Sequence, residues 1–237
     1  MKRYFHSLAL ICLALPALWG CQKTNIYETV KAMSVAQVDT TGFVSKTLQT
    51  NQFTSVEVDC FADVTYHQTP GGTPPRVVLS APPEVMDHLS AKTENGELGI
   101  HIDRGYQMPN RAIVVVHLYS PFVSSFSLQG GKCLRLGQMS ISSPLNLTLD
   151  GVGALTAEKV EAYEISAELN GAGNIDLHGI RTERLTADLN GAGNISLAGT
   201  CTDAYLNLNG AGNIDISGLK SQHPAQRSVN GVGNIKE

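Results

Sequence analysis

This sequence of 237 residues has little of the chemistry on which most enzymes and nucleic-acid-binding proteins depend. Charged residues make up only 16%, with 17 Lys and Arg against 21 Asp and Glu, and no basic run occurs. That balance argues against nucleic acid as a partner and against electrostatic binding to anionic lipid. The sequence has no Gly-x-Gly-x-x-Gly fingerprint, no Lys-bearing phosphate loop and no Ser/His/Asp arrangement that spacing supports. It therefore indicates no cofactor.

Cysteine is also scarce. Cys12 and Cys21 lie near the start of the chain, and Cys60, Cys133 and Cys201 are widely spaced. Without a Cys-x-x-Cys pair, neither a zinc knuckle nor a redox dithiol is indicated. We expect the last three to be small buried apolar residues, and the alternative is one disulfide with a leftover thiol in an exported chain.

Long apolar runs are missing except at the N-terminus. Met1-Lys-Arg precedes an apolar stretch from Leu8 to Leu18 that has the length of a signal-peptide core. A membrane-spanning helix needs about 20 apolar residues, and Lys23 follows closely, so a membrane anchor helix is disfavoured. Residues 1–20 are therefore predicted to be a signal peptide.

The end of this segment, Leu18-Trp-Gly-Cys21, resembles the lipobox of bacterial lipoprotein precursors. The resemblance implies that Cys21 becomes the lipidated first residue of the mature chain, carrying palmitate-type acyl chains. Trp19 departs from the small residue usual at its position, and an ordinary signal peptide is the alternative. Loss of Lys2 and Arg3 would leave 15 basic and 21 acidic residues, a net charge of −6.

Residues 21–42 are polar and aperiodic, and we expect a lipid-anchored tether there. Gln22-Lys-Thr-Asn25 contains no acidic residue. In lipoproteins such residues can act as retention or surface-export signals, so their absence slightly favours the periplasmic leaflet of an outer membrane over the cell surface. The expected localisation is the bacterial cell envelope.

What the sequence has in abundance is one repeated phrase. It occurs as Asn170-Gly-Ala-Gly-Asn-Ile175, Asn190-Gly-Ala-Gly-Asn-Ile195, Asn209-Gly-Ala-Gly-Asn-Ile214 and Asn230-Gly-Val-Gly-Asn-Ile235, with a degraded copy at Asp150-Gly-Val-Gly-Ala-Leu155. The period is close to twenty residues. Since one such unit cannot bury a core alone, the repeat predicts stacked coils of a solenoid.

The residues around each copy alternate between apolar and polar, the period of a half-buried strand. This predicts an all-β fold over residues 121–237, with two strands per coil joined by the glycine turn and closed by loops such as 179–184. Residues 43–120 read as short β segments that cap or continue the solenoid, with a tight turn at Asn95-Gly96. A short helix is expected within residues 81–92.

The repeated Gly and Asn residues have physical roles in this scheme. A sharp stacked corner has no room for a Cβ atom, and a column of amides can hydrogen-bond from coil to coil. The predicted turn ladder comprises Gly151, Gly171, Asn174, Gly191, Asn194, Gly210, Asn213, Gly231 and Asn234.

The repeated Gly-Ala-Gly-Asn-Ile phrase resembles the head-GIN domain of bacterial auto-transporter adhesins. Four earlier segments resemble that family in the same order: Phe53-Thr-Ser-Val-Glu-Val-Asp59, Ala62-Asp-Val-Thr-Tyr66, Ala81–Leu89 and Gly96-Glu-Leu-Gly-Ile-His-Ile102. The resemblance covers roughly residues 43–237 and implies a right-handed parallel β-helix on the cell envelope, often in a lipoprotein. It supplies no catalytic residues. Cys133 and Ala154 replace Asn in the ladder, so we expect the first coils to be only partly ladder-linked.

Two outward columns of polar side chains are the candidate binding face. They comprise Asp176, Ser196 and Asp215 on one side of the coils, and Glu168, Asp188 and Asn207 on the other. Evenly spaced polar groups suit a periodic polymer such as a glycan, or the β edge of an envelope or host protein. We therefore expect a non-catalytic envelope lipoprotein that acts by binding, as an adhesin or binding module.

Other functions have weaker support. Asp176 and Asp215, two coils apart, would lie near 9.6 Å, close to the range of about 6.5–9.5 Å for an inverting glycosidase pair. That face carries no Lys or Arg cluster, so a polysaccharide-processing enzyme ranks below a purely structural envelope component. The phrase is similar to the nonapeptide of calcium-binding β-rolls, but the acid recurs in only two coils. His178 stands alone, and no metal site is predicted.

Overall fold

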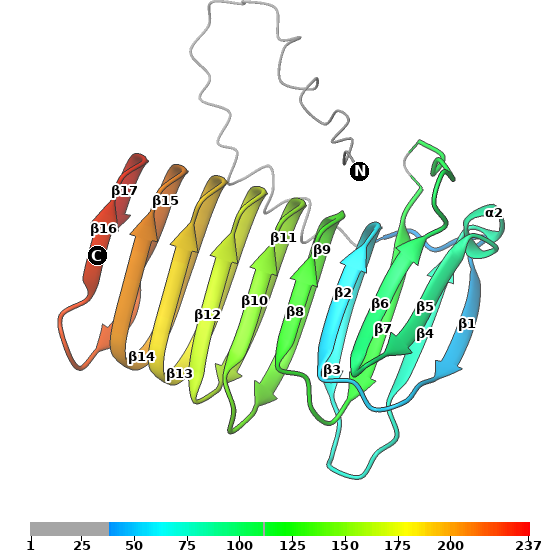
Figure 1. Ribbon diagram of the computed structural model, residues 1–237, viewed down its shortest axis with the longest axis horizontal. Coiled ribbons are helices and arrows are strands. Elements are labelled where there is room, and N and C mark those ends of the chain that lie inside the picture. Colours follow the sequence, from blue (N-terminus) through cyan, green and yellow to red (C-terminus); the bar gives the residue numbers. More distant parts are fainter. Residues whose placement is uncertain (1–37, 111) are drawn as a thin grey trace, which may run out of the picture.

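The computed structural model describes residues 38–110 and 112–237, so the predicted signal peptide and Cys21 lie outside the described residues. The chain is almost entirely β, with 67% strand and 2% helix, and forms a solenoid of about five turns with coils of about 21 residues. This confirms the predicted fold class. Figure 1 shows the coils stacked side by side along the long axis, with the C-terminal coil at one end. The helix found in the described part is too short to cross a membrane.

Each coil contributes one strand to each of two sheets, and neighbouring coils pair in parallel. Strands that precede the glycine turn form the first sheet: β8 (Ser125–Leu128), β10 (Leu145–Leu149), β12 (Glu164–Leu169), the later parts of β13 (Ala172–Leu189) and β14 (Ala192–Leu208), and β16 (Gln226–Val229). Strands that follow the turn form the second sheet: β9 (Gly131–Ser140), β11 (Val152–Glu161), the first parts of β13 and β14, β15 (Ala211–Ser221) and β17 (Val232–Lys236).

The N-terminal strands extend both sheets. A coil made of β2 (Ser55–Asp59) and β3 (Phe61–Gln68) lies between the β8–β9 coil and the coil of β6 (Glu97–Ile102) and β7 (Val114–Ser120). Beyond the β6–β7 coil the pairing is antiparallel. There β4 (Arg76–Ala81) pairs with β7, β1 (Val44–Gln49) pairs with β4, and β5 (Leu89–Glu94) pairs with β6. These three strands form the far end of the stack, opposite the C-terminal coil (Figure 1).

The expected helix within residues 81–92 is shorter than predicted. Only α2 (Pro83–Met86) is helical. The following residues form β5, which turns at Asn95 and Gly96 (φ 52° and 81°) into its antiparallel partner β6. Two consecutive positive φ angles are what a type I′ hairpin requires. Pairing with β6 gives the backbone N–H and C=O groups of these residues hydrogen-bond partners. A second helical turn would have left the edge of the first sheet unpaired.

The core is one continuous column of aliphatic side chains between the two sheets. Tyr66 is its largest fully buried residue. Its hydroxyl donates to the Ser120 carbonyl at 2.9 Å, and its ring meets Phe126 edge-on with 5.0 Å between centroids. The segments expected to be closing loops are themselves paired, as Val160 with Ile180 and Ile180 with Gly199. A third, shorter ladder thus closes the coils from β9 to β15, and for this reason β13 and β14 run unbroken through it.

The three cysteines of the described part are free and buried. Burial raises the pKa of the Cys60 thiol to about 12 and that of Cys133 to about 11. At neutral pH both are protonated, so they act as small apolar residues rather than nucleophiles.

Candidate functional site

The outer surface of the second sheet, which we call the ladder face, carries two straight columns of side chains. The strand register places one residue of each coil in each column. The corner column contains Asp63, Cys133, Ala154, Asn174, Asn194, Asn213 and Asn234. The neighbouring column contains Thr65, Arg135, Thr156, Asp176, Ser196, Asp215 and Lys236. Both alternate with inward aliphatic residues. The corner column is buried from Asp63 to Asn174 and becomes exposed only at Asn213 and Asn234, whereas the neighbouring column is partly exposed along its length.

The amides of the corner column form a hydrogen-bonded chain, the Asn ladder. Asn194 Nδ2 donates to Asn174 Oδ1, and Asn213 Nδ2 donates to Asn194 Oδ1, both at 3.2 Å. The backbone N–H of Asn234 donates to Asn213 Oδ1 at 3.2 Å. At the other end the ladder stops at Ala154. There Asn174, only 1% exposed, has an Nδ2 for which the described part of the chain supplies no acceptor.

This arrangement predicts unequal costs for removing two chemically identical residues. Asn194→Ala removes two hydrogen bonds between side-chain amides of the ladder and should lower the free energy of unfolding by about 1–2 kcal/mol. Asn174→Ala breaks one bond and also removes a buried donor without an acceptor, so its cost should stay within about 0.5 kcal/mol. Urea unfolding midpoints of the two variants test this, and equal losses would contradict it.

A second chain of amides follows the turn itself, at the first Asn of each repeat. Asn170 donates to Asp150 at 2.8 Å, Asn190 to Asn170 and Asn209 to Asn190 at 3.0 Å, and Asn230 to Asn209 at 3.2 Å. These residues are exposed. They bind each corner to the next, while the glycines beside them allow the close stacking.

A cavity of about 480 Å³ opens on the ladder face toward the C-terminal coil. Amides, a hydroxyl, one ion pair and one aliphatic residue line it, from Asn194, Ile195, Ser196, Asn213, Asp215, Asn234 and Lys236. Asp215 accepts from the Ser217 hydroxyl at 2.6 Å, from the Ser217 backbone N–H at 2.9 Å and from Lys236 Nζ at 3.0 Å. The hydrogen bonds from Ser217 and, less, those from Lys236 lower the pKa of Asp215. Its carboxylate is therefore ionised and already oriented.

The two columns of the candidate binding face lie on different sheets. Ser196 and Asp215 line the cavity, and Asp176 occupies the next rung of the same column. Glu168, Asp188 and Asn207 stand in register on the other sheet, so they belong to the opposite surface of the solenoid. There Asn207 donates to Asp188 at 2.6 Å, and Asn190 donates to Glu168 at 3.5 Å. His178 is exposed, and no cluster of three or more metal-ligating side chains occurs among the described residues.

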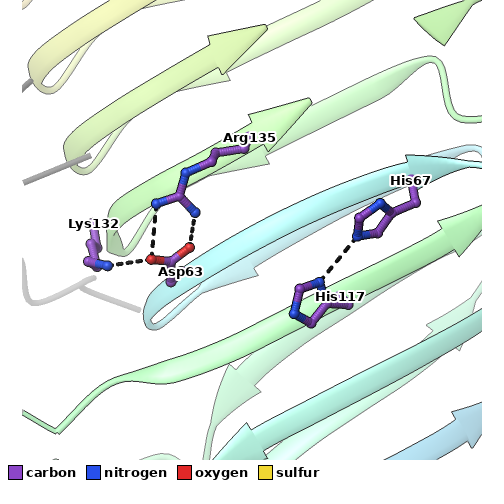
Figure 2. A network of polar contacts seen from close by, with 5 residues as sticks. All are labelled: Asp63, His67, His117, Lys132 and Arg135. Carbon is purple, nitrogen blue, oxygen red and sulfur yellow. Dashed lines mark hydrogen bonds and ion pairs between the residues drawn. The ribbon is translucent and has the colours of Figure 1, made fainter. Parts of the chain in front are cut away.

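Sequence reasoning missed a basic cluster at the N-terminal end of the ladder face (Figure 2). Lys132 and Arg135 both donate to Asp63, which is nearly buried. Burial opposes the charge of Asp63, but the hydrogen bonds and charges of Arg135 and Lys132 hold its pKa below the usual value. One signal was present in the sequence, namely a lysine at a position where the later coils have glycine. Lys132 pairs in register with Gly153, and its φ of 76° is of the kind that favours glycine.

Two histidines lie beside this cluster on β3 and β7. His67 Nε2 and His117 Nδ1 are 3.2 Å apart and share a hydrogen bond (Figure 2). The His67 ring stacks on Tyr119 with 4.7 Å between centroids, and the Arg76 guanidinium lies 4.2 Å from the centre of the Tyr119 ring. Burial, then the nearby His117 and Arg76, lower the pKa of His67. It is therefore mostly neutral at pH 7.

Comparison with known proteins agrees with this architecture. A family model described as "Putative auto-transporter adhesin, head GIN domain" matches residues 52–236. A crystal structure of a putative adhesin from Bacteroides fragilis is similar, with 17% identity, a TM-score of 0.64, and 82% of this chain and 96% of that one covered. A putative lipid binding protein from Parabacteroides distasonis is 15% identical, with a TM-score of 0.49 and coverage of 83% and 97%. No curated protein matches the chain.

Proposed function

The chain belongs to the head GIN domain family of auto-transporter adhesins, and from that premise we propose that it is a non-catalytic binding module of the cell envelope that holds an extended glycan along its ladder face. The observation that carries the proposal is the 480 Å³ cavity over the last coils, which lies within the size range of ligand sites. Its amide, hydroxyl and charged groups supply both donors and acceptors.

The spacing of these groups favours a polymer over a compact ligand. Neighbouring strands lie about 4.8 Å apart, so equivalent side chains recur at that interval along the stack. Each Asn side chain offers two donors and an acceptor, of which the ladder uses only part. A glycan chain presents hydroxyl groups at regular intervals and can contact the same type of residue on successive coils. Ser196 and Asp215 would then contact neighbouring parts of one ligand.

The state of Asp215 argues against one catalytic role, that of a general acid. A glycosidase of the inverting type needs one carboxyl group that is protonated near neutral pH. The pKa of Asp215 is instead lowered, and its oxygens already accept three hydrogen bonds. We infer that it positions a ligand as a fixed acceptor.

The binding experiment uses the soluble chain 22–237 on an array of glycans and matrix proteins, followed by titration calorimetry with the strongest hit. Ser196→Ala/Asp215→Ala should weaken binding at least about tenfold, since each lost hydrogen bond to a ligand contributes about 1 kcal/mol. Glu168→Ala/Asp188→Ala, on the opposite surface, is the matched control and should bind like the wild type.

Four results would count against the proposal. Loss of binding in the control but not in the ladder-face variant would place the site on the opposite surface. Release of shortened products from the bound glycan would favour a polysaccharide-processing enzyme. A blank array would favour a structural role in the envelope, and binding only to proteins would replace the glycan by a protein partner.

We also propose that the mature chain is a lipoprotein attached through Cys21, on the strength of the lipobox-like Leu18–Cys21 segment. An acyl chain contributes about 0.8 kcal/mol per buried CH₂, and two or three chains hold a protein firmly on a bilayer. Cys21→Ser should release the protein from the membrane fraction and abolish palmitate labelling. Cys60→Ser is the control, because that thiol is buried in the fold. Continued labelling of the Cys21 variant would refute the anchor.

A further inference from the structure

We propose that the ladder face carries a sugar-stacking subsite at His67, where one hexopyranose ring of an extended, β-1,4-linked glycan lies against the imidazole ring. The proposal rests on the glycan-binding function proposed above and specifies the ligand class. His67 belongs to β3, on the same surface as the two columns already described, and its side chain is half-buried.

One face of the His67 ring is covered by side chains from the neighbouring strands. Tyr119 of β7 lies against it, with 4.7 Å between ring centroids and 14° between the ring planes. The Arg76 guanidinium of β4 lies 4.2 Å from the centre of the Tyr119 ring, on the next strand along. The ring separation equals the strand spacing of about 4.8 Å. The His67 ring therefore stands upright on the sheet, with its faces directed along the stack of coils.

The opposite face of the His67 ring is open in the described part of the chain. Strands β3 and β9 pair in register up to Tyr66, so the residue of β9 beside His67 is Gly137. A Cβ atom built on Gly137 would meet only one atom within 4 Å, the Tyr66 carbonyl oxygen at 3.6 Å. Figure 2 shows the Arg135 side chain extended toward Asp63, away from His67. We call the open space above Gly137 the stacking gap.

The far side of the stacking gap carries a hydrogen-bond acceptor. Glu158 of β11 lies beside Gly137 in the next coil, because the residues on either side of these two are paired. The Glu158 side chain is exposed, and no hydrogen bond or ion pair with another described residue engages its carboxylate. Two strand spacings, about 9.6 Å, separate the backbone of His67 from that of Glu158. A cavity of about 160 Å³ opens next to this row of residues.

The dimensions of the stacking gap fit one pyranose ring. Carbon atoms in contact lie about 3.5–4.0 Å apart, so a sugar against His67 leaves roughly 6 Å to the backbone of Glu158. The long Glu158 side chain spans that distance and accepts a hydrogen bond of about 2.7 Å from a hydroxyl on the edge of the sugar. The gap thus combines one apolar contact with one polar contact.

The chemistry of the stacking gap selects a sugar whose ring faces are apolar. The pKa of His67 is lowered, first by burial and then by His117 and Arg76, so its ring is mostly neutral at pH 7. The face of a neutral aromatic ring is electron-rich and attracts C–H groups. A β-1,4-linked glucose residue has C–H groups on both ring faces and its hydroxyl groups along the edge. Its chain is extended, as a straight row of coils requires, whereas α-1,4-linked glucose forms a curved chain.

The subsite is pre-organised, and an extended ligand can reach from it to the amide-lined cavity. His67 Nε2 and His117 Nδ1 share a hydrogen bond at 3.2 Å, and Tyr119 stacks behind the ring. Little side-chain freedom is therefore lost on binding. Four strand spacings, about 19 Å, separate β3 from the strand β14 that carries Ser196. One oligosaccharide can thus contact both places.

The test measures calorimetric affinity of the soluble chain 22–237 for cellotetraose and for maltotetraose, which contain the same sugar in extended and curved chains. Cellotetraose should bind at least about fivefold more tightly. Gly137→Val fills the stacking gap and should weaken cellotetraose binding at least about tenfold. Its urea unfolding midpoint should stay unchanged, because the added atoms enter open space and the φ of Gly137 is not positive.

His67→Ala should weaken cellotetraose binding about fivefold, and His67→Phe should restore it, since an aromatic face is what the sugar contacts. The ring-proton NMR signals of His67 should shift when cellotetraose is added to the wild type. His88→Ala is the matched control, because that histidine is also stacked on a tyrosine, Tyr106, but lies outside the ladder face. It should bind like the wild type, and the signals of His88 should not shift.

The outcomes separate this inference from the function on which it rests. If cellotetraose binds and Gly137→Val keeps the full affinity, the stacking subsite is refuted while glycan binding on the ladder face stands. Equal affinity for maltotetraose would refute the selection of an extended chain. If neither tetrasaccharide binds but another glycan on the array does, the inference fails and the glycan-binding function stands. If no glycan binds at all, both proposals fail.

Discussion

Replacing Gly191 with alanine should prevent the solenoid from folding. A Cβ atom built at this position would lie 2.0 Å from the carbonyl oxygen of Gly171 and 2.6 Å from that of Asn170. Both are backbone atoms of the coil below, so no side-chain rotation can relieve the overlap. The adjacent coils would have to separate, which would break the ladder hydrogen bonds and open the core. We expect a loss of at least about 4 kcal/mol, which is exceptional for one methyl group.

The matched control is Gly71→Ala, in the loop between β3 and β4. A Cβ atom there meets nothing within 4 Å. Circular dichroism and urea unfolding of the two variants should show a native control and a Gly191 variant that is unfolded or insoluble. An unchanged unfolding midpoint for Gly191→Ala would mean that the corner does not need glycine and that the stacking shown here is wrong.

Removal of the Asp63 carboxylate is expected to have the second largest effect. The side chain of Asp63 is 7% exposed and accepts from Lys132 and Arg135, whose side chains are 11% and 31% exposed. Asp63→Ala leaves two partly buried cations without this counter-charge, and the loss of one partner of such a pair costs about 3–5 kcal/mol. Asp203→Ala is the control, because its partner His223 is largely exposed and surface pairs contribute less than about 1 kcal/mol.

The same residue predicts a pH dependence of stability. The pKa of Asp63 is lowered in the folded protein, so its contribution is complete above the unfolded pKa of about 3.9. The contribution is lost as the pH falls through the lower folded value, because both states then bind the proton. In urea unfolding, wild type and Asp63→Ala should differ fully at pH 7 and progressively less below pH 4. A difference that stayed constant down to pH 2 would show that the carboxylate charge is not responsible.

The strand order of the N-terminal region, the β5–β6 hairpin and the pairing of the closing segments could not be predicted from the sequence, because they depend on contacts between residues distant in the chain. Residues 43–120 lack the glycine corner, and nothing in their order shows that β2 and β3 enter the stack between β6–β7 and β8–β9. The hairpin of β5 and β6 replaces most of the expected helix, because the sheet edge offers hydrogen bonds that local propensity does not register. The closing segments also pair only because neighbouring coils stack in register.

By itself, the sequence determined the solenoid, its period and the residues of its corners. The glycine corner and the apolar residues around it recur at a nearly constant interval, so periodic burial and the steric need for glycine can be recognised in a single sequence. Only the tertiary structure decided where cavities form and which N-terminal residues join the polar columns of the repeat. The strands β3, β7 and β9 carry Asp63, His117 and Arg135. Their order in the stack differs from their order in the sequence, because β3 lies between β7 and β9, and only this stacking makes the three residues neighbours.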